Sequence, residues 1–239
     1  MSGIDPAKWE AMLLGLKEKF AGKHIPGEAT ILPVGRPRFL YLVGPPAGGK
    51  SSVMKEIHGQ LGVTTGDEII KLWPRRYTNS RGVEKVAAEF RGEYLEDVVT
   101  DERRGLSLGV TREGGFGGTD AIGMAAAAEA QSWIETCPFL PNVILGEGQR
   151  LTSAKFFVAA ARRTELTIGE LWAPQHVLDA RCKARGSTQR ESFRVAAATR
   201  SKNAVHAARK AGVRVAQIDT QKVSVEEAAR FLLQVSRIS

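Results

Sequence analysis

The sequence has only two cysteines among its 239 residues, Cys137 and Cys182, and neither has the neighbours of a metal-ligand motif. Two isolated thiols argue against a disulfide framework or a structural zinc site, so we expect both to be reduced. No apolar run approaches the length of a transmembrane helix, and no signal peptide opens the chain. We therefore expect a cytoplasmic globular protein with no membrane partner.

Acidic residues are also in short supply, with 26 Asp and Glu against 34 Lys and Arg, which gives a net charge of +8. This excess favours a polyanionic partner such as nucleic acid. An arginine-rich site for phosphate groups explains the same excess equally well, so charge alone leaves both interpretations open. The length fits one large domain or one domain with insertions.

The strongest motif in the sequence lies in residues 38–52. An apolar run predicts a buried strand, SVMKEIHGQL predicts a helix, and G-x-x-x-x-G-K-S lies between them. Glycines let backbone N–H groups surround phosphate oxygens, and the helix N-terminus adds positive charge. In this motif the lysine reaches the β- and γ-phosphates of ATP and the serine binds Mg²⁺. The predicted nucleotide site consists of Gly44, Ala47, Gly48, Gly49, Lys50, Ser51 and Ser52.

Strands and helices alternate along the rest of the chain, which predicts an α/β fold: a three-layer parallel sheet with helices on both faces. We expect residues 1–37 to form an N-terminal helix and loop, and residues 38–239 to form the main domain. Further strands are expected at 69–73, 105–110, 143–145, 165–174 and 213–220. Helices are expected at 86–104, 121–135, 151–163 and 224–238. Thr119 or Asp120 is expected to cap the second of these, and Ser224 and Glu227 are expected to form a capping box at the start of the last.

Basic side chains gather in two segments. The stretch after the predicted strand at 69–73 suits an anion-binding loop because guanidinium groups match phosphate bidentately, although a solvated basic turn is the alternative. This stretch contributes Arg75, Arg76, Thr78 and Arg81. A second set lies in a helical hairpin at about 178–200, bent at Gly186, where Arg181 and Arg185 share one helix face. Like charges at that spacing repel, which favours a lid that closes over a triphosphate rather than a solvated helix.

The order of these motifs resembles the guanylate-kinase-like branch of the P-loop nucleotide kinases. The resemblance rests on the phosphate loop, on RRYTNSRGVE, on FGGTD and on the lid RCKARGSTQRESFRVAAATR, and covers roughly residues 38–237. The acceptor loop departs from the pattern of that branch, since it reads YTNSRG. PPAGGKSS, RRYTNSRG and EGQR are more similar to phage kinases that phosphorylate 5-hydroxymethyluracil in DNA, which would place the protein in the host cytoplasm.

The resemblance implies transfer of the γ-phosphate of ATP to a hydroxyl in DNA. Arg181 and Arg185 would close on the triphosphate, and the basic loop would hold the phosphate of the acceptor. Glu147, just past the strand at 143–145, or Asp67, would take the proton of the hydroxyl. Two alternatives remain: a nucleoside monophosphate or ribose-bisphosphate kinase, and a DNA-associated ATPase module.

Overall fold

The computed structural model describes residues 35–72, 75–78, 82–87, 90–111, 117–123, 125–187 and 189–239. Contacts divide the chain into two units, Met1–Gly35 and Arg36–Ser239. The N-terminal helix predicted within residues 1–37, and most of the loop after it, lie outside the described residues, so the fold described is that of the second unit. No helix in the described ranges is both long enough and apolar enough to cross a membrane.

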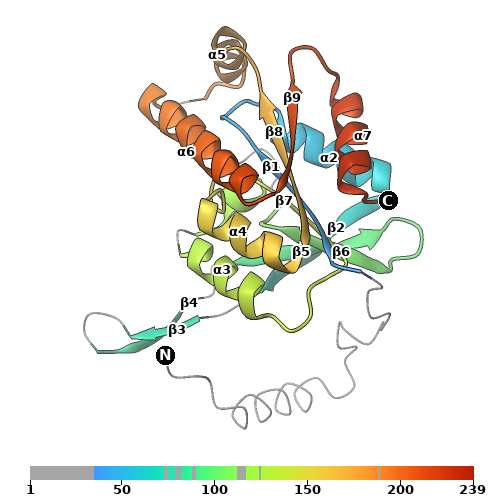
Figure 1. The fold of residues 1–239 in the computed structure, drawn as a ribbon, viewed down its shortest axis with the longest axis vertical. Coiled ribbons are helices and arrows are strands. Elements are labelled where there is room, and N and C mark those ends of the chain that lie inside the picture. Colours follow the sequence, from blue (N-terminus) through green and yellow to red (C-terminus); the bar gives the residue numbers. More distant parts are fainter. Residues whose placement is uncertain are drawn as a thin grey trace. The chain divides into compact units, whose positions relative to one another are not determined.

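The centre of this unit is a seven-stranded sheet with the strand order β2-β5-β6-β7-β1-β8-β9 (Figure 1). The pairs β6–β7, β7–β1, β1–β8 and β8–β9 are parallel, as the sequence predicts, whereas β5 runs antiparallel to both of its neighbours. The strands are β1 (Arg38–Val43), β2 (Val63–Lys71), β5 (Arg91–Asp97), β6 (Arg103–Leu108), β7 (Val143–Glu147), β8 (Glu165–Trp172) and β9 (Arg214–Asp219).

Helices cover both faces of the sheet and give the α/β fold its three layers (Figure 1). Side chains alternate along β1: Phe39, Tyr41 and Val43 join a core with α3, α4 and α6, while Leu40 and Leu42 join a core with α2 and α7. The helices are α2 (Lys50–Leu61), α3 (Ala126–Thr136), α4 (Ala154–Arg163), α5 (Gln175–Ala184), α6 (Glu191–Lys210) and α7 (Val225–Ser236), with a short 3₁₀ turn η1 (Thr119–Ala121).

The helix predicted at 86–104 is wrong. β3 (Arg75–Thr78) and β4 (Glu84–Ala87) pair as a separate two-stranded sheet, and β5 and the start of β6 occupy the rest of the segment. β5 pairs with β2 on one side and β6 on the other, and Gly92 allows the close approach of β6, because a Cβ at this position would lie 2.8 Å from the Ser107 carbonyl oxygen. Pairing between strands therefore overrides the helix-forming composition of the segment.

The other elements agree more closely with the sequence. The helical hairpin is confirmed as α5 and α6, with Gly186 between them at a φ of 61°. The capping box at the start of α7 is confirmed too: Ser224 accepts a hydrogen bond from the Glu227 backbone N–H, and Glu227 accepts one from that of Ser224. Both predictions depend on local chain geometry, which short motifs specify well.

Candidate active site

The glycine-rich loop joins the end of β1 to the start of α2, as the sequence predicts. At Gly44, which has a φ of 146°, a Cβ would lie 2.2 Å from the Leu171 carbonyl oxygen of β8. Gly49, at 89°, and Ala47, at 61°, also have positive φ values. The loop therefore has the left-handed turns that direct successive backbone N–H groups inward.

Lys50, the first residue of α2, lies across this loop. Its side chain is buried, and Nζ donates hydrogen bonds to the carbonyl oxygens of Gly44, at 3.1 Å, and Pro45, at 3.0 Å. Burial lowers the pKa of Lys50, while the carboxylates of Glu147 and Asp120 oppose that shift. The ammonium group thus occupies the centre of a site with two acidic neighbours.

Glu147 ends β7, the strand beside β1, and its side chain is buried against the loop. Burial raises the pKa of Glu147, and the charge of Asp120 raises it further. The Lys50 charge and a hydrogen bond with Ser51 act in the opposite direction. A buried carboxylate beside the glycine-rich loop, with its pKa raised, is a candidate for accepting a proton.

Asp120 is the acidic residue that sequence reasoning placed wrongly, as a possible helix cap. α3 begins only at Ala126, and the Asp120 carboxylate instead accepts a hydrogen bond of 2.7 Å from the Gln149 backbone N–H. Its neighbour Thr119, the other predicted cap, donates to the Glu147 carbonyl oxygen at 2.8 Å. These bonds fix η1 against the end of β7, which brings Asp120 to the site.

Gln149 is a second residue that sequence reasoning missed. Its side chain is buried, and Nε2 donates to the Gly44 carbonyl oxygen, at 2.6 Å, and to Ser201 Oγ, at 2.9 Å. Ser201 lies on α6, so this one amide joins the glycine-rich loop to the second helix of the hairpin. Gln149 lies within the EGQR motif, but that motif was used only for its carboxylate, because the contacts of Gln149 depend on elements that meet only in the fold.

Of the two arginines predicted to form a lid, Arg181 reaches the glycine-rich loop from α5. Arg181 donates from Nη1 to Thr220 Oγ1, at 2.9 Å, and to the Ala47 carbonyl oxygen, at 3.5 Å. Arg185 is exposed just past the end of α5, yet its charge contributes to the lowered pKa of Lys50. Arg194, further along the hairpin, forms an ion pair of 2.5 Å with Asp179 instead.

The model of one protein family, described as P-loop Nucleotide Kinase3, matches residues 36–228. The chain belongs to this family. It is a P-loop nucleotide kinase, a phosphotransferase that binds a nucleotide. No curated protein matches the chain.

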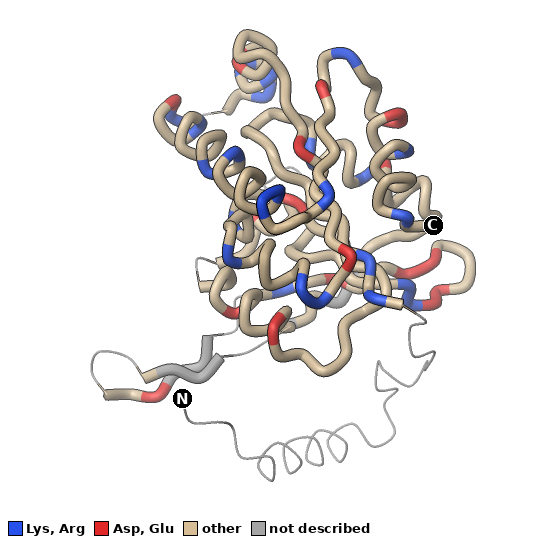
Figure 2. Tube along the Cα trace, in the orientation of Figure 1, with Lys and Arg blue, Asp and Glu red and all other residues tan. Residues whose placement is uncertain are grey.

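The residues predicted to bind the acceptor are described less fully. Arg75, Arg76 and Thr78 lie on β3, and Asp67 lies on β2. The side chains of Arg75, Arg76 and Asp67, and the whole of Arg81, lie outside what the structure describes. Lys and Arg recur along α5 and α6 (Figure 2). The basic side chains that the structure describes are therefore partly on the hairpin near the glycine-rich loop.

Proposed function

We propose that this kinase transfers the γ-phosphate of ATP to the hydroxyl of 5-hydroxymethyluracil in DNA. The observation that carries the proposal is the buried Glu147 carboxylate, whose pKa is raised beside Lys50 and Ser51. A hydroxyl acceptor must lose a proton during transfer, whereas a phosphate acceptor need not. Glu147 supplies a base for that proton.

The donor nucleotide would bind the backbone N–H groups of the loop from Gly44 to Ser52. Lys50 would leave the carbonyl oxygens of Gly44 and Pro45 and pair with the β- and γ-phosphates. Arg181 already lies against the loop, and Arg185 is near enough for its charge to affect Lys50. Both would neutralise charge that develops during transfer.

Magnesium fits the residues present. Asp120 raises the pKa of Glu147, so the site holds two mutually repelling carboxylates, an arrangement that a divalent cation stabilises. The Ser51 hydroxyl and the Asp120 carboxylate are oxygen ligands of the kind Mg²⁺ prefers, and Mg²⁺ retains several waters. When bound, the ion would neutralise phosphate charge, while Glu147 holds the proton of the acceptor.

DNA as the acceptor is supported by the net charge of +8 and by the resemblance of three motifs to the phage DNA kinases. Arg75, Arg76, Thr78 and Arg81 are the proposed contacts to its phosphates. Asp67 is a second candidate for the base, with less support than Glu147 because it lies on the edge strand β2. These assignments rest on sequence position.

A kinase that acts on a free nucleotide is the main alternative, and the description of the family favours it because it names nucleotides. A DNA-associated ATPase module has less support. β7 is short and ends in Gly-Glu followed by glycine, whereas such ATPases typically have a longer apolar strand that ends in aspartate.

The test is mass spectrometry of nucleosides digested from DNA after incubation with ATP and enzyme. DNA containing 5-hydroxymethyluracil should yield a phosphorylated nucleoside, and matched thymine DNA should not. Lys50→Ala, which removes the ammonium from the phosphate site, serves as the inactive control. Phosphorylation of free monophosphates alone would establish the nucleotide kinase, and DNA-stimulated ATP hydrolysis without a phosphorylated product would establish the ATPase.

A further inference from the structure

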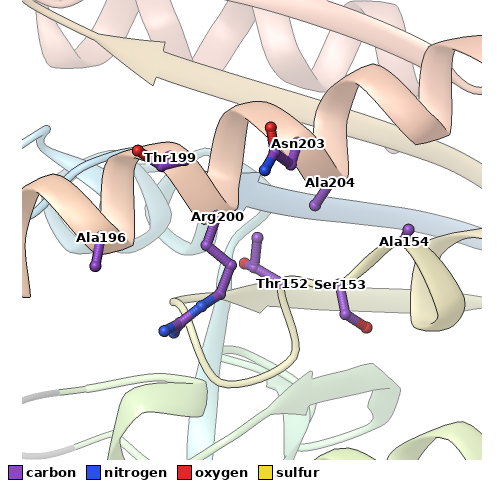
Figure 3. Close-up of a pocket in the computed structure, with 8 residues that line it drawn as sticks. All are labelled: Thr152, Ser153, Ala154, Ala196, Thr199, Arg200, Asn203 and Ala204. Carbon is purple, nitrogen blue, oxygen red and sulfur yellow. The ribbon is translucent and has the colours of Figure 1, made fainter.

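An open surface cavity of about 570 Å³ lies between α6 and the segment that leads into α4 (Figure 3). One wall is a stripe of α6 that includes Thr199, Arg200 and Asn203, and the other includes Thr152 and Ser153. The remaining lining residues are alanines. Cavities of this volume are typical of small-ligand sites.

The lining has a single charge, which is positive. Arg200 extends from α6 toward the segment before α4 (Figure 3) and is exposed. Among the residues that the structure describes, no carboxylate pairs with Arg200 and no acidic side chain lines the cavity. A guanidinium group that pairs with no carboxylate of the described residues, between small and hydroxyl-bearing side chains, is suited to a phosphate.

Residues of both walls form hydrogen bonds with the chain segment that follows Glu147. Thr152 Oγ1 donates to the Gly148 carbonyl oxygen at 2.6 Å, and Ser201, next to Arg200, accepts a hydrogen bond from Gln149. Gly148 and Gln149 directly follow Glu147 in the chain. The lining of the cavity is therefore linked by hydrogen bonds to the two residues that follow Glu147, the residue proposed as the base.

We infer that this cavity holds a phosphate group of the acceptor, with Arg200 as its principal ligand. The inference rests on the proposed function and adds a contact for the acceptor that is separate from the loop around β3. The chemistry fits either a phosphate monoester of a free nucleotide or a phosphodiester of DNA. Arg200 binds and positions the acceptor but takes no part in proton transfer.

The experiment measures acceptor binding directly, without ATP, by titration with two probes. One probe is thymidine 5′-monophosphate, and the other is a short labelled duplex containing 5-hydroxymethyluracil, followed by fluorescence anisotropy over a range of salt concentrations. Arg200→Ala should weaken binding of the true acceptor class about tenfold, as expected for loss of one charge-assisted contact. For the duplex, the slope of log affinity against log salt should also fall by about one.

Two further variants isolate the cavity from general charge and stability effects. Lys210→Ala removes a positive charge from the far end of the same helix. It should change the monophosphate affinity and the salt slope less than Arg200→Ala does. Ala196→Leu leaves the charge unchanged and places a larger side chain on the lining of the cavity; leucine suits a helix, so α6 should persist. It should weaken the same probe that Arg200→Ala weakens.

The two probes distinguish the sources of the phosphate. An effect on the monophosphate alone assigns a free nucleotide, and an effect on the duplex alone assigns DNA. The inference would be overturned if wild type, Arg200→Ala and Ala196→Leu bound each probe with the same affinity. It would also be overturned if wild type bound neither probe. Failure of the proposed function is seen separately, as the absence of a phosphorylated product while these binding effects persist.

Discussion

Gln149 Nε2 donates a hydrogen bond of 2.6 Å to the Gly44 carbonyl oxygen, which also accepts one from Lys50 Nζ at 3.1 Å. If Lys50 turns to a bound phosphate, the buried Gly44 oxygen still has the Gln149 amide as its partner. Since a buried carbonyl without a partner is costly, Gln149 stabilises the loop in the form that binds nucleotide. Ser201 connects the same amide to α6.

Replacement of Gln149 by leucine should destabilise the protein by about 1–3 kcal/mol, because it leaves Gly44 and Ser201 without their amide partner in a buried site. Chemical denaturation measures this loss in free energy of unfolding. Ser201→Ala is the matched variant, and the double mutant should cost less than the sum of the two single changes. Strict additivity would show that the amide and the hydroxyl do not act together.

Glu147→Gln should lower the turnover number by about 10²- to 10⁴-fold if Glu147 accepts the proton of a hydroxyl substrate. The burial and the Asp120 charge raise the pKa of Glu147 above its ordinary value. A base works only when deprotonated, so turnover in the wild type should rise with pH through that raised pKa. Steady-state rates across pH measure this, and the acidic limb should disappear in the glutamine variant. An unchanged rate in Glu147→Gln would remove the base assignment.

Arg185→Ala should reduce turnover more than affinity for ATP, because an exposed guanidinium at the proposed lid would contribute most where charge develops during transfer. Turnover kinetics and equilibrium ATP binding measure the two effects. Arg190→Ala is the control, since Arg190 is an exposed arginine in the same hairpin, at the start of α6. Equal losses in the two variants would mean that only the overall charge of the hairpin matters.

The sequence predicted the parts of the site that are continuous in the chain. The glycine-rich loop, Lys50 and the capping box at Ser224 each follow from a short motif whose geometry is local. Glu147 was predicted because it ends an apolar run. Kinase membership follows from the same loop and is confirmed by the family match over residues 36–228.

The residues that were missed depend on contacts between distant segments. Asp120 and Gln149 meet because η1 packs against the end of β7, which no spacing in the sequence indicates. The segment at 86–104 was predicted to be a helix because its Glu and Ala residues favour one. The structure has strands there because β5 gains hydrogen bonds and packing from β2 and β6, which are contacts that the segment itself does not reveal. The positions of Asp120 and Gln149 and the structure of residues 86–104 all depend on which strands are neighbours in the sheet, and this order is a property of the whole fold.

Two glycine-to-alanine changes only a few turns apart should have opposite effects on stability. At Gly44, the added Cβ would meet the Leu171 carbonyl oxygen at 2.2 Å, on a backbone with a φ of 146°. Gly44→Ala should therefore lose about 3 kcal/mol or more, and nucleotide binding with it. At Gly59, in α2, nothing lies within 4 Å, and Gly59→Ala should gain about 0.5–1 kcal/mol because alanine favours a helix. Thermal and chemical unfolding measure both, and a tolerated Gly44→Ala would show that the loop does not pack against β8 as described.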